Sequence, residues 1–119
     1  MSSRLYRPDL MKGQVCVVSG GGTGIGAACA RELAHLGATV VIGSRKAENY
    51  EPAAAGLSRE CGREVEGVAL DIRDRDAVRE TVAGIVDRHG RIDVLVNNGG
   101  GQFFSPAEVI SDKGWDAVV

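Results

Sequence analysis

The sequence predicts an α/β fold in which helices cover both faces of a doubly wound parallel sheet. Three observations carry this prediction: four short apolar runs recur along the 119 residues, amphipathic segments separate them, and the connections are short. Nearly continuous apolar runs are typical of strands that are buried on both faces. Regular alternation of strands and helices requires right-handed crossovers, which place the strands side by side in parallel.

The expected strands are residues 15–18, 39–42, 65–70 and 94–96. Three of these runs are rich in Val or Ile, whereas 65–70 is more mixed because it contains a Glu and a Gly. With right-handed crossovers the strands should lie in the order third, second, first, fourth. A ligand is then expected at the switch point between the first and the fourth strand.

Helices are expected between these strands. Apolar residues recur at spacings of three and four over 25–36 and again over 78–86, which predicts two amphipathic helices. Asp74 is placed to cap the start of the second helix. Residues 46–61 form the least regular candidate, because Pro52 must lie in the first turn of a helix or break it.

Composition limits the functions that the chain can have. The formal net charge is −2, 44% of the residues are hydrophobic, and the basic residues are dispersed, so we expect no nucleic-acid partner. No apolar run approaches 18 residues, and residues 1–9 lack the apolar segment of a secretory signal. We therefore expect neither a membrane span nor secretion. The three cysteines lack metal-ligand spacing, which predicts inert thiols in a reducing compartment and no metal site.

The most informative segment is the glycine-dense turn between the first strand and the first helix. Gly20, Gly24 and Gly26 follow the pattern Gly-x-x-x-Gly-x-Gly, headed by the hydroxyl residue Ser19. Glycines let a bulky anion approach the backbone, and the following helix aims its free N–H groups at the same place. The turn therefore predicts a site for the pyrophosphate of a dinucleotide, against the alternative of a glycine-rich surface loop. The residues expected to contact it are Ser19, Gly20, Gly22, Thr23, Gly24, Ile25 and Gly26.

The residues after the second strand indicate which dinucleotide is bound. In NAD-selective proteins an acidic residue near this point binds the adenosine ribose, but here Ser44, Arg45 and Lys46 follow the strand. A guanidinium pairs well with a 2′-phosphate, whereas a carboxylate would repel it. We therefore expect NADP(H), with Ser44 and Arg45 in contact and Lys46 adding positive potential. The alternative is that the two cations form a solvated helix start.

The glycine pattern resembles the cofactor turn Thr-Gly-x-x-x-Gly-x-Gly of the short-chain dehydrogenase/reductase family. The run Asn97-Asn98-Gly99-Gly100 resembles the family's Asn-Asn-Ala-Gly, with Gly99 in the place of Ala. The resemblance implies a Rossmann-like domain in which Asn97, Asn98 and Gly99 lie along the cofactor, with a structural role for the Asn97 amide.

The resemblance also covers the end of the third strand. Asp71 and Ile72 resemble the family's contact with adenine, in which the Asp side chain lies near the exocyclic amine. Asp71 could instead cap a turn.

Within the family, residues 97–115 resemble the reductases of enoyl-CoA thioesters. The resemblance implies NADPH-dependent reduction of a trans-2-enoyl-CoA to an acyl-CoA in fatty acid metabolism. It also implies that Gln102, Phe103 and Phe104 line the acyl-CoA pocket, whose walls must be apolar. Two alternatives remain open: a family member that reduces a carbonyl such as that of a 3-oxoacyl thioester, and a module that binds NADP(H) without catalysis.

No catalytic residue is identified in this chain. The family's Tyr-x-x-x-Lys pair is absent, because Tyr6 is followed four places later by Leu10 and Tyr50 by Ala54. We therefore expect residues 1–119 to be the N-terminal part of a single NAD(P)-binding domain, with the catalytic Ser, Tyr and Lys beyond Val119. For the whole protein we expect a homo-oligomer, cytoplasmic in a bacterium or peroxisomal in a eukaryote.

Overall fold

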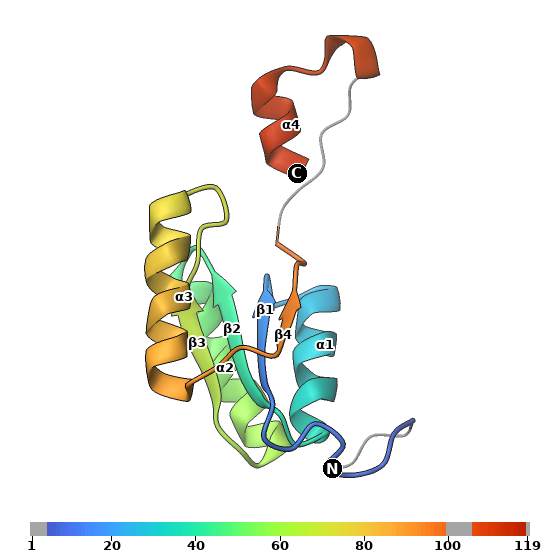
Figure 1. The fold of residues 1–119 in the computed structure, drawn as a ribbon. Helices are drawn as coiled ribbons and strands as arrows, with labels where there is room; N and C mark the ends of the chain where they lie inside the picture. The colour runs from blue at the N-terminus through green and yellow to red at the C-terminus, as the bar shows by residue number, and fades with distance from the viewer. Residues whose placement is uncertain (1–4, 100–105, 119) are drawn as a thin grey trace.

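The structure is a computed structural model that describes residues 5–99 and 106–118. Its centre is one sheet of four parallel strands in the order β3-β2-β1-β4. The predicted α/β class and strand order are thus confirmed (Figure 1). The strands are β1 (Val15–Ser19), β2 (Thr39–Ser44), β3 (Val65–Ala69) and β4 (Val94–Val96).

Helices cover both faces of the sheet. The helices α1 (Gly24–His35) and α2 (Ala47–Cys61) pack on one face and contact each other, and α3 (Arg75–His89) lies on the other face (Figure 1). A short 3-10 turn, η1 (Ala107–Val109), and the helix α4 (Asp112–Val118) lie beyond the carboxyl ends of the strands. Because all four strands are parallel, the loops that follow their carboxyl ends lie at the same edge of the sheet.

The core follows from the alternation of side chains along each strand. Cys16 and Val18 of β1 and Ile42 of β2 point to the side of α1 and α2, where they are fully buried. Val17 and its neighbours on the opposite face pack against Ile85 of α3. Because both faces are covered, the strands could be apolar at nearly every position, as the sequence shows.

The helices agree with the sequence except at one position inside α2. The Asp74 carboxylate accepts a hydrogen bond from the N–H of Ala77 at 3.1 Å, which confirms it as the N-cap of α3. The expectation for Pro52 was wrong, because α2 runs through it and Pro52 lies in the second turn. Proline leaves the carbonyl of Glu48 without its helical donor. Both residues are exposed, so water can take the place of that donor.

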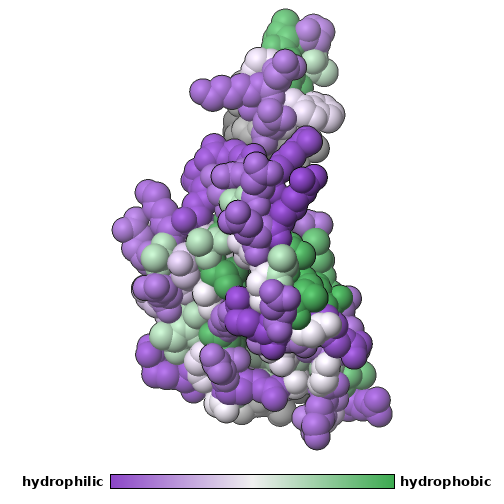
Figure 2. Space-filling view, turned by 60° about the vertical axis from the view of Figure 1, so that its left-hand side comes forward, coloured by the Kyte–Doolittle hydropathy of each residue, from purple (hydrophilic) through white to green (hydrophobic). Residues whose placement is uncertain are grey.

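A cleft of about 970 Å³ lies between α3 and β4, and it is largely apolar. Leu95, at the edge strand, is 57% exposed beside it, and Val82 and Val86 of α3 are also exposed. Figure 2 shows hydrophobic surface on this side of the molecule, surrounded by hydrophilic side chains. In the part of the chain that the structure describes, no helix has the length and apolar character needed to cross a bilayer.

Candidate dinucleotide site

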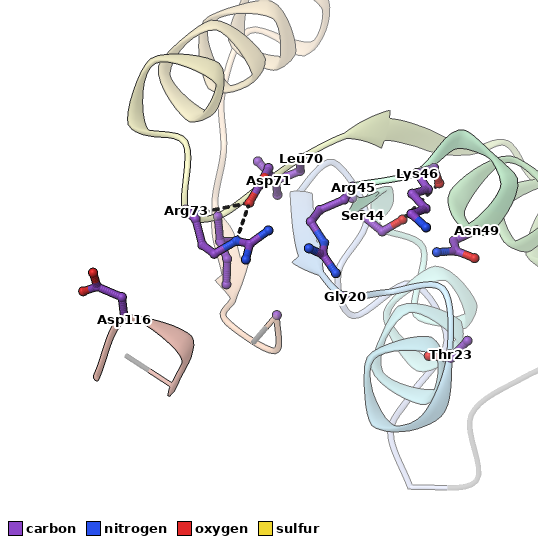
Figure 3. A pocket seen from close by; sticks show the side chains of 13 residues that line it. Gly20, Thr23, Ser44, Arg45, Lys46, Asn49, Leu70, Asp71, Arg73 and Asp116 are labelled. Atoms are coloured by element: carbon purple, nitrogen blue, oxygen red, sulfur yellow. Dashed lines mark hydrogen bonds and ion pairs between the residues drawn. The ribbon is translucent and has the colours of Figure 1, made fainter. Parts of the chain in front are cut away.

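A cleft of about 580 Å³ opens at the carboxyl ends of the strands. Figure 3 shows its opposite sides: the turn after β3 lies on one side, and the end of β2 with the start of α2 lies on the other. The glycine turn after β1 completes the wall. Eight of the predicted cofactor residues line the cleft: Gly20, Thr23, Ser44, Arg45, Lys46, Asp71, Ile72 and Gly99.

The glycine turn presents the uncapped end of α1. Thr23 stands at the N-cap in an extended conformation, and its side chain makes no capping hydrogen bond. The first turn of α1 contains no acidic residue. The first backbone N–H groups and the positive end of the helix dipole are therefore available to an anion in the cleft.

Two glycines of the pattern are required for different reasons. A Cβ on Gly26 would lie 2.2 Å from the carbonyl oxygen of Gly20, so any side chain there would push the helix away from the turn. Gly24 has φ +56°, and a Cβ there would meet no protein atom within 4 Å. Its constraint is therefore conformational, because side chains disfavour left-handed backbone.

The Ser19 hydroxyl joins the turn to the loop after β4. It donates to the carbonyl of Val96 at 3.2 Å, and it accepts from the N–H groups of Asn98 at 3.0 Å and Gly99 at 2.9 Å. The Asn98 amide donates to the carbonyl of Gly20 at 3.2 Å. Asn98 therefore ties the loop to the glycine turn, whereas Asn97 is exposed. Ser19 is buried and lines the other cleft, so here it holds the loop in place.

The side of the cleft formed by β2 and α2 is cationic. Arg45 and Lys46 are exposed between the last residue of β2 and the first turn of α2. Lys46 lies 3.8 Å from the Glu48 carboxylate, and both side chains are largely solvated. Among the described residues, Arg45 has no ion-pair partner. Its guanidinium is therefore available to an anion.

The opposite side carries the Asp71 carboxylate. Its Oδ1 accepts from the Arg73 backbone N–H at 3.0 Å and from the Arg73 Nε at 3.3 Å. These hydrogen bonds, and the charges of Arg73 and Arg45, hold the pKa of Asp71 below its ordinary value. The turn-capping alternative for Asp71 is thus present in the structure. This capping contact and a place in the cleft wall are compatible, because the Asp71 that caps the turn also lines the cleft.

Two other predicted residues of the glycine turn, Gly22 and Ile25, are not among those that line the cleft. A Cβ on Gly22 would lie 3.4 Å from the carbonyl oxygen of Asn49 in α2, and Ile25 is strongly exposed at the start of α1. The expected pocket residues Gln102, Phe103 and Phe104 lie outside the described residues.

Sequence reasoning did not single out several residues that line the cleft. These are Gly43, Asn49, Leu70, Arg73 and Asp116. The position of Arg73 directly after Asp71-Ile72, in a turn, was the one available signal. In residues 5–99 and 106–118 no group of three or more His, Cys, Asp or Glu is arranged to hold a metal ion.

Comparison with known proteins shows the family of this chain. The sequence profile of the short chain dehydrogenases matches residues 14–119. The chain therefore belongs to the short-chain dehydrogenase family.

Curated relatives of the chain include enzymes with different substrates. The peroxisomal 2,4-dienoyl-CoA reductase of Danio rerio is 35% identical over 117 residues, and the match covers 98% of this chain and 39% of that protein. Gluconate 5-dehydrogenase of Gluconobacter oxydans is 40% identical, with 97% of this chain and 45% of that protein covered. The chain thus spans less than half the length of both relatives.

Solved structures share the fold. A citronellol catabolism dehydrogenase from Pseudomonas aeruginosa superposes with a TM-score of 0.82 at 46% identity, over 96% of this chain and 46% of that one. The L-sorbose reductase of Gluconobacter frateurii, solved with NADPH and L-sorbose, gives a TM-score of 0.80 at 31% identity, over 89% of this chain and 40% of that one.

Proposed function

We propose that this chain is the nucleotide-binding part of an NADPH-dependent oxidoreductase. The observation that carries the proposal is the cleft itself, which combines an uncapped helix start with an unpaired guanidinium. NADP(H) carries two such anions: its pyrophosphate suits the helix start, and its 2′-phosphate suits the guanidinium of Arg45. Solved relatives bound to NADP or NADPH support the choice of cofactor.

The residues present fit such a cofactor. The N–H groups at the start of α1 would hold the pyrophosphate, and Arg45 with Ser44 and Lys46 would hold the 2′-phosphate. Asp71 and Ile72 would lie at the adenine, and Gly99 along the ribose and nicotinamide. When bound, the nicotinamide supplies a hydride. The residues of this chain would bind and orient it, and we assign no proton donor for the substrate oxygen among them.

For the substrate we propose an unsaturated acyl-CoA thioester, with reduction of a trans-2-enoyl-CoA as the specific reaction. Two observations support it. The segment 97–115 resembles peroxisomal trans-2-enoyl-CoA reductase, with its triple glycine, Gln-Phe and Ser-Pro-Ala-Glu. Several relatives that match nearly the whole chain are 2,4-dienoyl-CoA reductases, which act on the same kind of thioester.

A second candidate is the oxidation of an alcohol or the reduction of a carbonyl. It is favoured by the similarity to gluconate 5-dehydrogenase and to the citronellol catabolism dehydrogenase. The latter is 46% identical to this chain, which is more than the dienoyl-CoA reductases are. The third alternative, a module that binds NADP(H) without catalysis, predicts a downstream sequence without Tyr-x-x-x-Lys.

The test is an assay of the full-length protein that follows NADPH absorbance. Crotonyl-CoA, a 2,4-dienoyl-CoA and acetoacetyl-CoA are compared as substrates, and citronellol is tested with NADP⁺. Oxidation of NADPH with crotonyl-CoA at the highest kcat/KM supports the proposal. A preference for the dienoyl-CoA would correct the substrate within the same class. Turnover of acetoacetyl-CoA or citronellol alone would establish the second candidate instead.

A further inference from the structure

The turn after β3 contains a feature that the proposed function does not use. Arg73 donates twice to one oxygen of Asp71, from its backbone N–H at 3.0 Å and from its side-chain Nε at 3.3 Å. Both contacts go to Oδ1. Among residues 5–99 and 106–118 no hydrogen bond to Oδ2 is present.

The two side chains lie together at the edge of the cleft. Figure 3 shows the Asp71 carboxylate beside Arg73, across the cleft from Ser44 and Lys46. The Asp71 side chain is 36% exposed and that of Arg73 is 59% exposed. An aspartate with this exposure would rotate about its side-chain torsions if nothing held it. Two donors on Oδ1 restrict that rotation and leave the lone pairs of Oδ2 for a ligand.

We propose that Arg73 is a positioning residue, which holds Asp71 so that its second oxygen accepts a hydrogen bond from the exocyclic amine of the adenine base. The inference rests on the proposed function, because it takes NADP(H) as the ligand. An ionised carboxylate only accepts hydrogen bonds. It therefore favours a purine with an amino group at this place and repels one with a carbonyl oxygen. Asp71 is ionised at neutral pH, as an ordinary aspartate is, and its hydrogen bonds with Arg73 lower its pKa further.

The charge of Arg73 suggests a second role, which is to attract the 2′-phosphate. Arg73 and Arg45 both line the cleft, so Arg73 could simply add to the positive potential that attracts the 2′-phosphate. The two roles depend on different properties of the side chain. Positioning requires a donor nitrogen at the place of Nε, whereas attraction requires a positive charge.

Substitutions at this position separate donor from charge. Arg73→Gln places an amide nitrogen where Nε stood and removes the charge. Arg73→Lys keeps the charge but moves the nitrogen further along the chain. Arg73→Ala removes both and retains the backbone N–H. Arg79→Ala, on the exposed surface of α3 and away from the cleft, is the matched control.

The experiment measures binding of three reduced dinucleotides to the full-length protein by fluorescence titration. NADPH is compared with NADH, which lacks the 2′-phosphate, and with reduced nicotinamide hypoxanthine dinucleotide phosphate, which has a carbonyl in place of the amine. We expect wild type and Arg79→Ala to prefer NADPH over the hypoxanthine analogue by about tenfold, as one hydrogen bond to a charged group provides. The preference should fall to about twofold in Arg73→Ala and Arg73→Lys and should return in Arg73→Gln.

The outcomes distinguish this inference from the proposed function. If Arg73→Ala keeps the full preference for the amine but loses preference for NADPH over NADH, Arg73 serves the phosphate and the inference is wrong. If wild type binds NADPH and the hypoxanthine dinucleotide phosphate equally, the role of Asp71 at the amine is wrong as well. A wild-type protein that binds none of the three dinucleotides would overturn the proposed function itself.

Discussion

Replacement of Ser19 by alanine tests how the cleft is held together. Ser19 is 4% exposed. Its hydroxyl bonds to the carbonyl of Val96, the last residue of β4, at 3.2 Å and to the N–H groups of Asn98 and Gly99 in the following loop at 3.0 and 2.9 Å. Ser19→Ala leaves two N–H groups and one carbonyl without that partner. A buried group left unpaired costs about 1–3 kcal/mol. Because Asn98 and Gly99 are only partly buried and water can reach them, we expect a total loss of about 2–3 kcal/mol in the free energy of unfolding.

The same substitution should weaken NADPH binding. The loop that carries Gly99 forms part of the cleft wall, so a loop that is no longer fixed must be ordered when the ligand binds. We expect the dissociation constant for NADPH to rise about fivefold in Ser19→Ala. Ser19→Thr, which keeps the hydroxyl, should bind NADPH like wild type.

Ser58 provides a matched control. Its hydroxyl donates to the carbonyl of Ala54 at 2.7 Å and accepts from the N–H of Val65 at 2.8 Å, near the C-terminal end of α2 and not among the residues that line the cleft. Urea denaturation should show a comparable loss of stability in Ser58→Ala, while fluorescence titration should show no change in NADPH affinity. If Ser19→Ala loses stability and affinity no differently from Ser58→Ala, the proposed role of the hydroxyl in shaping the cleft is refuted.

Three further predictions concern other parts of the structure. Arg45→Asp should weaken NADPH binding by about 2–3 kcal/mol, since it removes a charge-assisted pair and adds repulsion, with a much smaller effect on NADH; equal losses in titrations of both would contradict the phosphate role. Gly24→Val, at φ +56° on the exposed turn, should abolish NADPH binding while circular dichroism shows a retained fold; normal affinity would disprove the position assigned to the pyrophosphate. The side chain of Arg91 and the N–H of Val15 hold the pKa of Asp93 below its ordinary value of 3.8, so this carboxylate stabilises the fold above about pH 4 and its contribution is lost as pH falls further. Thermal unfolding from pH 6 to pH 3 should therefore show a smaller acid-induced loss in Asp93→Asn than in wild type.

The sheet was predictable because its central strands, β1 and β2, are buried on both faces. Continuous apolar runs such as those around Val17 and Val41 are typical of parallel strands that helices cover on both faces. The right-handed crossovers between such strands then determine the strand order. Helix α2 was harder to predict, because Pro52 is normally incompatible with a helix interior. Its exposed position lets water bond to the freed carbonyl of Glu48, and the sequence alone does not show exposure.

The site was predictable to the extent that backbone geometry determines it. The glycines and the residues just after β2 and β3 follow from the strand order, so Arg45 and Asp71 could be placed at one cleft. The hydrogen bonds of individual side chains could not. Ser19 bonds to residues nearly eighty positions later in the chain, and Arg73 reaches back to Asp71 only because the turn bends there. Such contacts depend on torsion angles that no spacing in the sequence specifies.

The relatives of this chain differ in the substrates that their names give. A dienoyl-CoA reductase, a gluconate dehydrogenase and a citronellol catabolism dehydrogenase all match nearly the whole chain. The cleft at the carboxyl ends of β1, β2 and β3 is built entirely from residues in the matched region. Solved relatives with NADP or NADPH bound also match most of this chain, so we expect the binding site for this cofactor to be the feature that the relatives share. Identity over this chain therefore supports the family and the cofactor far more strongly than it supports the enoyl-CoA substrate, which rests on the short stretch after β4.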